Sequence, residues 1–257
     1  MPKMFISNSI LRELLKKATD EERLTLTKIL EPHRKKPFNP KKLQKAICQE
    51  GGNGLANKFR GQGTGYLDIL DDVAKELKIK KIPSYSTTVK YYDKVKSLSY
   101  GKKKSKKLSV KYAEKVEEKI ILKLLKISYK NMSKKEKVSF NKQINKVTQK
   151  FDSNRTTHLT GTAALMALGN LGGFATYTFL TSAISTITMG TLGFGAYTAA
   201  TSLLSIVLGP IGWAGLGVAA IWEVGKPDYK KLIPIVAVIG AIRQRIKYEN
   251  ETIIISQ

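Results

Sequence analysis

Residues 156–222, which begin TTHLTGTAALMALGNLGGF and end GPIGWAGLGVAAIW, contain no Asp, Glu, Lys or Arg in 67 consecutive positions. A helix at the surface of a soluble protein normally keeps charged residues on its solvent face. A charge-free stretch of this length is therefore either a fully buried core or a segment that enters a membrane.

The composition of this stretch is unlike that of a permanent membrane anchor. It holds eleven of the 20 glycines and sixteen Ser or Thr residues. Glycine clusters at 169–173, 190–195 and 209–217 divide it into helices of about 15–20 residues, close to the roughly 20 that cross a hydrocarbon core. The turn at 190–195 would join two antiparallel helices, and small residues four apart would let them approach closely.

Such a hairpin of moderate hydrophobicity can be buried in a water-soluble helical shell and released at a bilayer. It resembles the buried hairpin of pore-forming colicin domains. The tryptophans near its end also suit an apolar-to-polar boundary. The side chains expected to enter the membrane are Phe174, Phe179, Leu180, Ile184, Ile187, Leu192, Phe194, Leu203, Leu204, Ile206, Val207, Trp213 and Trp222.

Charge divides the chain into three regions: a cationic helical region at 1–155, the charge-free helical region at 156–222, and a helix with a tail at 223–257. The first region holds 39 Lys and Arg against 16 Asp and Glu, and the last holds 6 against 4. This asymmetry suggests an anionic partner, either lipid or nucleic acid. A set of solvated lysine-rich faces without any partner is the alternative.

The cationic region reads as a series of amphipathic helices, because its apolar residues recur at helical spacing. No sustained alternation of apolar and polar residues precedes the last positions, 252–255. The sequence thus predicts an all-α fold in which amphipathic cationic helices surround the Gly/Ala/Ser/Thr-rich hairpin. Helices are expected at 8–31 as one helix or a pair capped near Thr19, and at 41–50, 66–80, 109–129, 133–150 and 232–246.

Six glycines fall within residues 51–65, just before the helix expected to begin at Tyr66. Backbone N–H groups there could cradle an anion together with Lys58 and Arg60. The segment lacks the ending of a phosphate-binding P-loop. A tight turn between packed helices is the favoured explanation of the glycines.

The densest positive charge is at 101–107, which the sequence predicts to be an exposed loop able to rest on phosphates. Cations near the end of the last helix suit a similar role. The residues expected to contact anionic lipid are Lys58, Arg60, Lys102, Lys103, Lys104, Lys106, Lys107, Arg243 and Arg245.

Catalytic residues, metal ligands and cofactor sites are not indicated. Asp68, Asp71, Asp72 and Glu76 can share helical faces, but acidic residues also suit the first turn of a helix and a solvated face. The sequence holds two histidines and one cysteine, with no nucleophile, base and orienting group at a recognisable spacing. We therefore expect a protein that is not an enzyme and has no cofactor.

The cellular location follows from two observations. Cys48 is the single cysteine, which excludes an intrachain disulfide and fits a reducing cytoplasm. Arg12, Glu13, Lys16 and Lys17 interrupt the apolar residues near the N-terminus, so no secretory signal is expected there. We expect a cytoplasmic protein that associates with membranes.

Several strings are specific in combination: the glycine-rich residues 51–54 and 59–61, YLDILDDV at 66–73, GPIGW at 209–213, KPDYKKLIP at 226–234 and Arg243–Gln244. They resemble the YaaW-type family of bacterial proteins, which is grouped with ubiquinol–cytochrome c chaperones. The resemblance spans most of the chain and implies work at a membrane complex without an enzyme site.

Three functions are open at this point. The first is a membrane-active protein that binds anionic lipid and inserts residues 156–222, with oligomerisation into a pore. The second is an assembly factor or chaperone that holds a membrane-protein client. The third, nucleic-acid binding, is the least expected, because the basic segments contain few interleaved aromatic residues.

Overall fold

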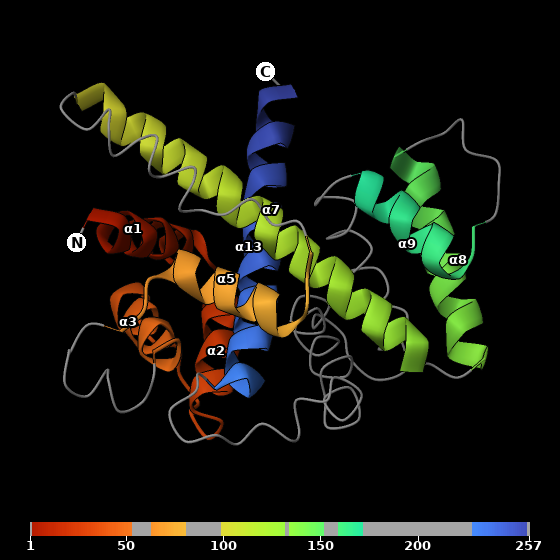
Figure 1. Ribbon diagram of the computed structural model, residues 1–257, viewed down its shortest axis with the longest axis horizontal. Helices are drawn as coiled ribbons and strands as arrows, with labels where there is room; N and C mark the ends of the chain where they lie inside the picture. The colour runs from red at the N-terminus through yellow and green to blue at the C-terminus, as the bar shows by residue number, and fades with distance from the viewer. Residues whose placement is uncertain are drawn as a thin grey trace. The chain divides into compact units, whose positions relative to one another are not determined.

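The computed structural model describes residues 2–52, 63–80, 99–131, 134–151, 159–171 and 228–255 (Figure 1). Every regular element in these ranges is an α-helix, which confirms the predicted all-α class. The hairpin expected around residues 190–195 lies outside the described residues. The helices are α1 (Pro2–Lys17), α2 (Asp20–Leu30), α3 (Pro40–Glu50), α5 (Tyr66–Glu76), α7 (Ser99–Asn131), α8 (Lys134–Phe151), α9 (Gly161–Asn170) and α13 (Tyr229–Ile255).

The chain forms two compact units. Unit 1 comprises Met1–Ile120 and Trp222–Val236, and unit 2 comprises Ile121–Ile221 and Ala237–Gln257. The long helices α7 and α13 each contribute residues to both units. These boundaries follow spatial contacts, whereas the division at 155 and 222 follows charge, so the three charge regions stay a prediction.

Helices α1 and α2 form the predicted pair, with the predicted cap between them. The Thr19 hydroxyl accepts a hydrogen bond from the Glu22 backbone N–H at 3.2 Å, and the Glu22 carboxylate accepts one from the Thr19 N–H at 2.7 Å. This reciprocal capping box satisfies two backbone donors that a helix start would otherwise leave unpaired. The chain therefore turns sharply between α1 and α2.

In unit 1, α1 packs against α3 and α5, and α2 packs against α3 (Figure 1). Two glycines permit this close packing. A Cβ on Gly51 would lie 2.3 Å from Ile69 Cγ1, and one on Gly63, where φ is +41°, would lie 2.5 Å from the Cys48 carbonyl oxygen. These two glycines thus serve as structural turns.

Helix α5 ends at Glu76, four residues earlier than expected. Lys78 adopts a positive φ of 52°, and its N–H donates to the Lys75 carbonyl oxygen while the Ile79 N–H donates to that of Ala74. This is the Schellman arrangement, in which glycine usually takes the left-handed position. Lysine at that position gives no sequence signal for a helix end.

The lysine-rich residues 101–107 are helical, which corrects the predicted loop. They form the first turns of α7, and the apolar residues that follow are buried on one face of the same helix, among them Val116 and Ile120. Lysine is a good helix former, and each like-charge pair costs only about 0.2–0.5 kcal/mol. The helix therefore extends N-terminally into the lysine run.

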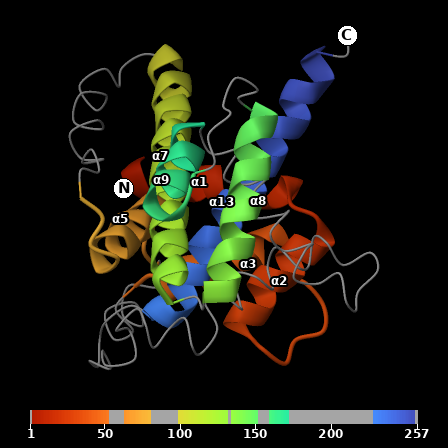
Figure 2. The ribbon, with the colours of Figure 1, turned by 90° about the vertical axis from the view of Figure 1, so that its right-hand side faces the viewer.

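In unit 2, α8 packs against α9 (Figure 2). Phe140 of α8 lies 5.2 Å from Tyr129 of α7, measured between ring centroids. Gly169 of α9 also comes close to α7, because a Cβ there would lie 2.9 Å from Leu122 Cδ1. The part of α7 in unit 2 therefore contacts α8 through Tyr129 and Phe140, and α9 through Leu122 and Gly169.

Helix α13 is longer than predicted at both ends. It includes Pro234 as its sixth residue, where the ring removes the N–H that would donate to Lys230. Residues 232–240 are all buried. The helix continues through Ile255, so the apolar residues at 252–255 belong to a helix.

Two tyrosines of unit 1 join α5 and α7 through buried polar contacts. The Tyr66 hydroxyl donates to Glu117 Oε1 at 2.7 Å, and these residues are 0% and 1% exposed. The Tyr112 hydroxyl donates to Asp71 Oδ1. A buried carboxyl group requires hydrogen-bond donors, so these contacts fix how α7 lies on α5.

Cys48 is buried in a small polar cluster of α1 and α3. The Arg12 guanidinium donates to Gln44 Oε1 at 2.8 Å, the Gln44 amide donates to Cys48 Sγ at 3.5 Å, and the thiol donates to Asn8 Oδ1 at 3.3 Å. Burial raises the pKa of the Cys48 thiol to about 11, against the lowering effects of Gln44 and Arg12. The thiol is therefore unreactive at neutral pH.

Replacing Tyr66 with Phe should lower the free energy of unfolding by about 1–3 kcal/mol, because one hydrogen bond to the buried Glu117 carboxyl is lost. Urea unfolding followed by circular dichroism measures this change. Tyr229→Phe is the matched control, since this half-buried tyrosine has no hydrogen bond in the described part of the chain. Equal stability of the two variants would contradict the assigned role of Tyr66.

The Cys48 thiol should also make stability depend on pH. Its pKa is raised in the folded state from about 9 to about 11, so the stabilisation is complete below pH 9 and is lost as pH rises toward 11. The loss approaches about 2.7 kcal/mol, at 1.36 kcal/mol per unit. The difference between wild type and Cys48→Ala across this range isolates the effect from other titrating groups; a constant difference would contradict it.

Candidate membrane-facing site

The thirteen side chains expected to enter a membrane lie outside the described residues, and so do Lys58 and Arg60. The structure does describe the first part of the charge-free stretch, residues 159–171. Most of this part is α9, the helix that packs against α8. The candidate site is therefore built within unit 2, from α8, α9 and the basic residues of α13, and the basic residues of α7 in unit 1 are described by themselves.

Unit 2 carries the exposed apolar side chains. Among the described residues, the large hydrophobic side chains with high exposure are Val138 of α8, 69% exposed, and Met166 of α9, 58% exposed. On the opposite side of α9, Leu165 and Leu168 are buried. Met166 is thus an exposed apolar side chain within the described start of the charge-free stretch, and Val138 lies on the helix that packs against it.

Two asparagines of α8 hold the start of the charge-free stretch. The Asn145 amide donates to the Leu159 carbonyl oxygen at 2.8 Å, and the Leu159 N–H donates back to Asn145 Oδ1 at 2.9 Å. Asn141 Oδ1 accepts from the Gly161 N–H at 3.1 Å. We call this pair, Asn141 and Asn145, the asparagine clasp.

The clasp itself is anchored. The Asn141 amide donates to the Tyr129 hydroxyl at 3.2 Å, and the Asn145 amide also donates to the Asn141 carbonyl oxygen at 2.9 Å. Asn145 is 9% exposed. No sequence pattern marks these residues, because their partners are backbone atoms that only the tertiary structure brings near.

The predicted lipid-contact lysines of α7 differ in their surroundings. Lys106 forms an ion pair with Glu13 at 2.5 Å, and its hydrogen bond lowers the pKa of Glu13. Lys107 is exposed. The backbone of Lys102, Lys103 and Lys104 is helical, and their side chains lie outside the described part. Lys106 is thus partly neutralised, whereas Lys107 faces solvent.

The predicted cations of α13 are less accessible. Arg243 is 7% exposed, on the same apolar helix as the buried Ile239 and Ile242. Arg245 forms an ion pair with Glu249 at 2.6 Å. The burial of Arg243 argues against a contact with lipid headgroups, while the contact by Arg245 stays a prediction.

A row of exposed lysines on α7 was missed by the sequence analysis. Lys107, Lys111 and Lys115 follow one another four residues apart and are all exposed. Their spacing places them about one helical turn apart. The signal was present in the sequence, but it was hidden by the expectation of a loop at 101–107.

The acidic residues of α5 lie near Tyr229. Burial raises the pKa of the Tyr229 hydroxyl, and the nearby carboxylates of Asp72 and Glu76 raise it further. Within the described ranges, no group of three or more His, Cys, Asp or Glu side chains is placed to hold a metal ion. The acidic residues of α5 therefore interact with tyrosines of unit 1: Asp71 accepts a hydrogen bond from Tyr112, and Asp72 and Glu76 raise the pKa of Tyr229.

In the helices that the structure describes, none is long and apolar enough to cross a membrane. The two long helices, α7 and α13, carry charged residues. Insertion of residues 156–222 stays a prediction, since most of that stretch lies outside the described residues.

The fold and the site together define an all-α, strongly cationic protein with a charge-free stretch fastened to one helix. In sequence, the chain is similar to bacterial proteins described as UPF0174 protein. One, from Helicobacter pylori, is 24% identical over 212 residues, which cover 81% of this chain and 89% of the relative. Another, from strain J99 of the same species, is 25% identical over 208 residues, covering 78% and 69%.

The similarity of the chain to these bacterial proteins is distant. No family model matches the sequence. No solved structure matches it either.

Replacing Asn145 with Ala should speed hydrogen exchange at the Leu159 amide, because that N–H loses its acceptor. Loss of a hydrogen bond worth about 1.4 kcal/mol corresponds to about tenfold faster exchange. Mass-spectrometric exchange on peptides covering 159–171 measures the rate. Asn170→Ala, at the exposed end of α9, is the control, and equal rates in both variants would contradict the clasp.

Proposed function

We propose that this protein binds anionic membrane lipid and inserts residues 156–222 into the bilayer, where copies associate into a pore. The observation that carries the proposal is the 67-residue charge-free stretch beside a region with 39 basic and 16 acidic residues. Attraction of about 1 kcal/mol per basic residue near an anionic surface would bring the chain to the membrane. The charge-free stretch would then supply the apolar contact.

Features of unit 2 support this proposal. The charge-free stretch begins against α8 and is held there by hydrogen bonds of the asparagine clasp, which water or headgroups can replace. Met166 already exposes apolar surface at the first helix of the stretch. Stable attachment to membranes generally needs two signals, such as a basic surface together with an apolar insertion.

An assembly factor for a membrane-protein complex is the second candidate. The observation that favours it is the resemblance of residues 66–73 and 226–234 to YaaW-type proteins, which are grouped with ubiquinol–cytochrome c chaperones. In this role, the charge-free stretch would contact an apolar segment of the client. Such a protein would bind its client, and bilayer permeability would not change.

Release of an entrapped dye from vesicles distinguishes the two candidates. With phosphatidylglycerol in the vesicles, the pore proposal expects leakage that weakens as salt screens the lysines. Vesicle binding without leakage would favour the assembly factor. Absence of both binding and leakage at low salt would overturn the proposal.

A charge placed in the stretch provides the matched test. Ile206→Lys should reduce leakage by about 100-fold, because a lysine near the bilayer centre costs about 2.5–3.5 kcal/mol. Asn250→Lys adds the same charge at an exposed position of α13 and should leave leakage close to wild type. Equal leakage in both variants would show that residue 206 does not enter the bilayer.

A further inference from the structure

Helix α8 carries an exposed row of residues that its packing does not use. Lys134, Val138, Lys142, Lys146 and Lys150 follow at intervals of four, and all five side chains are exposed. The row extends over about 24 Å, at about 1.5 Å per residue. On the packed side of the same helix, Phe140, Ile144 and Val147 are buried.

We infer that this row, which we call the α8 lysine row, is the surface that rests on the anionic bilayer. The inference depends on the proposed function and names the part of the molecule that makes the first contact. Its partner is a layer of acidic phospholipid headgroups. Three observations lead to this assignment: the uncompensated charge, the apolar residue within the row, and the attachment of the charge-free stretch to the same helix.

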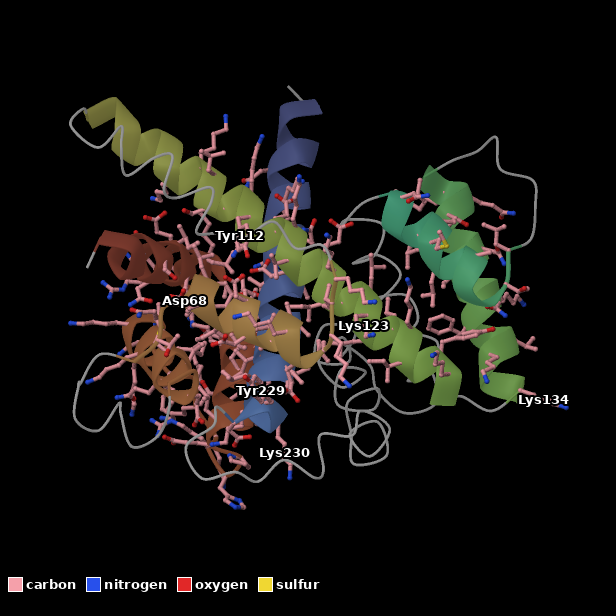
Figure 3. The ribbon with its side chains drawn as sticks, viewed as in Figure 1. Asp68, Tyr112, Lys123, Lys134, Tyr229 and Lys230 are labelled. Carbon is pink, nitrogen blue, oxygen red and sulfur yellow. The ribbon has the colours of Figure 1, made fainter. Side chains whose placement is uncertain are left out.

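The charge of the row is not compensated within the described ranges. Helix α8 contains six lysines and one glutamate, and the ion pairs found in the described part of the chain include none of Lys142, Lys146 and Lys150. Lysines four apart on a helix repel one another. An anionic surface removes this repulsion, so the row has a physical reason to bind one. Figure 3 shows Lys134, at the first turn of α8, directed away from the ribbon.

The apolar residue distinguishes lipid from nucleic acid. Val138, which lies between Lys134 and Lys142 in the row, is 69% exposed. A bilayer offers apolar acyl chains directly beneath its phosphates, which suits a basic helix with an apolar side chain. The backbone of nucleic acid offers phosphate and sugar to such a row and no apolar partner for valine. The composition of the row thus favours lipid.

The row lies on the helix that holds the charge-free stretch. Asn145 binds Leu159 by two hydrogen bonds and is adjacent in sequence to Lys146 of the row. Binding of the row would therefore place the start of residues 156–222 near the headgroups. The α7 lysines Lys107, Lys111 and Lys115 belong to unit 1, whereas the asparagine clasp and the described start of the stretch belong to unit 2.

The test compares two triple variants in the full-length protein. Lys142, Lys146 and Lys150→Gln removes three charges from the row, and Lys35, Lys41 and Lys45→Gln removes three exposed charges from unit 1. Each row lysine is expected to contribute about fivefold to partitioning, from about 1 kcal/mol. The row variant should thus bind phosphatidylglycerol-containing vesicles on the order of 100-fold more weakly than the control variant. Co-sedimentation measures both.

The outcomes separate this inference from the proposed function. If wild type binds these vesicles and the two variants bind equally, the α8 assignment is overturned while lipid binding stands. If wild type binds no vesicles, the proposed function fails as well. A loss of DNA binding in the row variant with unchanged vesicle binding would also overturn it, in favour of nucleic acid.

A label at residue 138 gives an independent readout. In a Cys48→Ala background, V138C carrying an environment-sensitive dye should shift its emission to the blue on vesicles with phosphatidylglycerol and not on pure phosphatidylcholine. K41C, exposed on α3, should show no shift. Equal shifts at both positions, or none at residue 138 while wild type binds, would overturn the assignment.

Discussion

The hydrogen bonds between Asn145 and Leu159 mark the point where a charged chain becomes an uncharged one. The helices before this point are rich in lysine. After it, no charged residue follows until Glu223. A chain of this kind needs a polar contact that fixes the entry to the charge-free stretch. Asn145 provides it because one amide group satisfies both the N–H and the carbonyl oxygen of Leu159.

Such a contact is suited to reversible attachment. Neutral hydrogen bonds contribute about 0.5–1.5 kcal/mol each, since water replaces them when they break. Buried apolar contacts of α8 and α9, such as those of Ile144 and Leu168, contribute more per side chain. The asparagine clasp therefore specifies where the stretch begins, while packing supplies most of the stability of unit 2.

The helical class and most helix positions could be predicted from the sequence. The spacing of Leu11 and Leu15, the cap at Thr19 and the break at Pro37 are local signals that tertiary structure did not override. The end of α5 could not be predicted, because Lys78 holds a conformation that usually needs glycine. The lysine run of α7 was misread because charge density resembles a loop, although lysine itself favours a helix.

The sequence predicts that the candidate site is basic, but it does not predict which of the basic side chains are exposed. Lys107 was identified from the density of lysines, and its exposure agrees with an accessible cation. Arg243 is predicted from its place near the end of the last helix, yet it is buried, since position along an apolar helix decides which face a residue occupies. Net charge thus predicts an anionic partner, and burial in the fold decides which of the predicted cations are accessible.

The two lysine rows illustrate this selection. The lysines of the α7 row lie on a helix that also contains Glu117. This glutamate is buried and accepts a hydrogen bond from Tyr66, so it does not face solvent beside the lysines. The α8 row has one glutamate in its helix and surrounds an exposed valine. Charge alone makes the two rows equivalent for any anion. An apolar residue among the lysines adds a preference for a partner that is charged at its surface and apolar beneath it. In the proposed function, the α8 lysine row, more than the total charge of the chain, would therefore decide which part of unit 2 meets the bilayer.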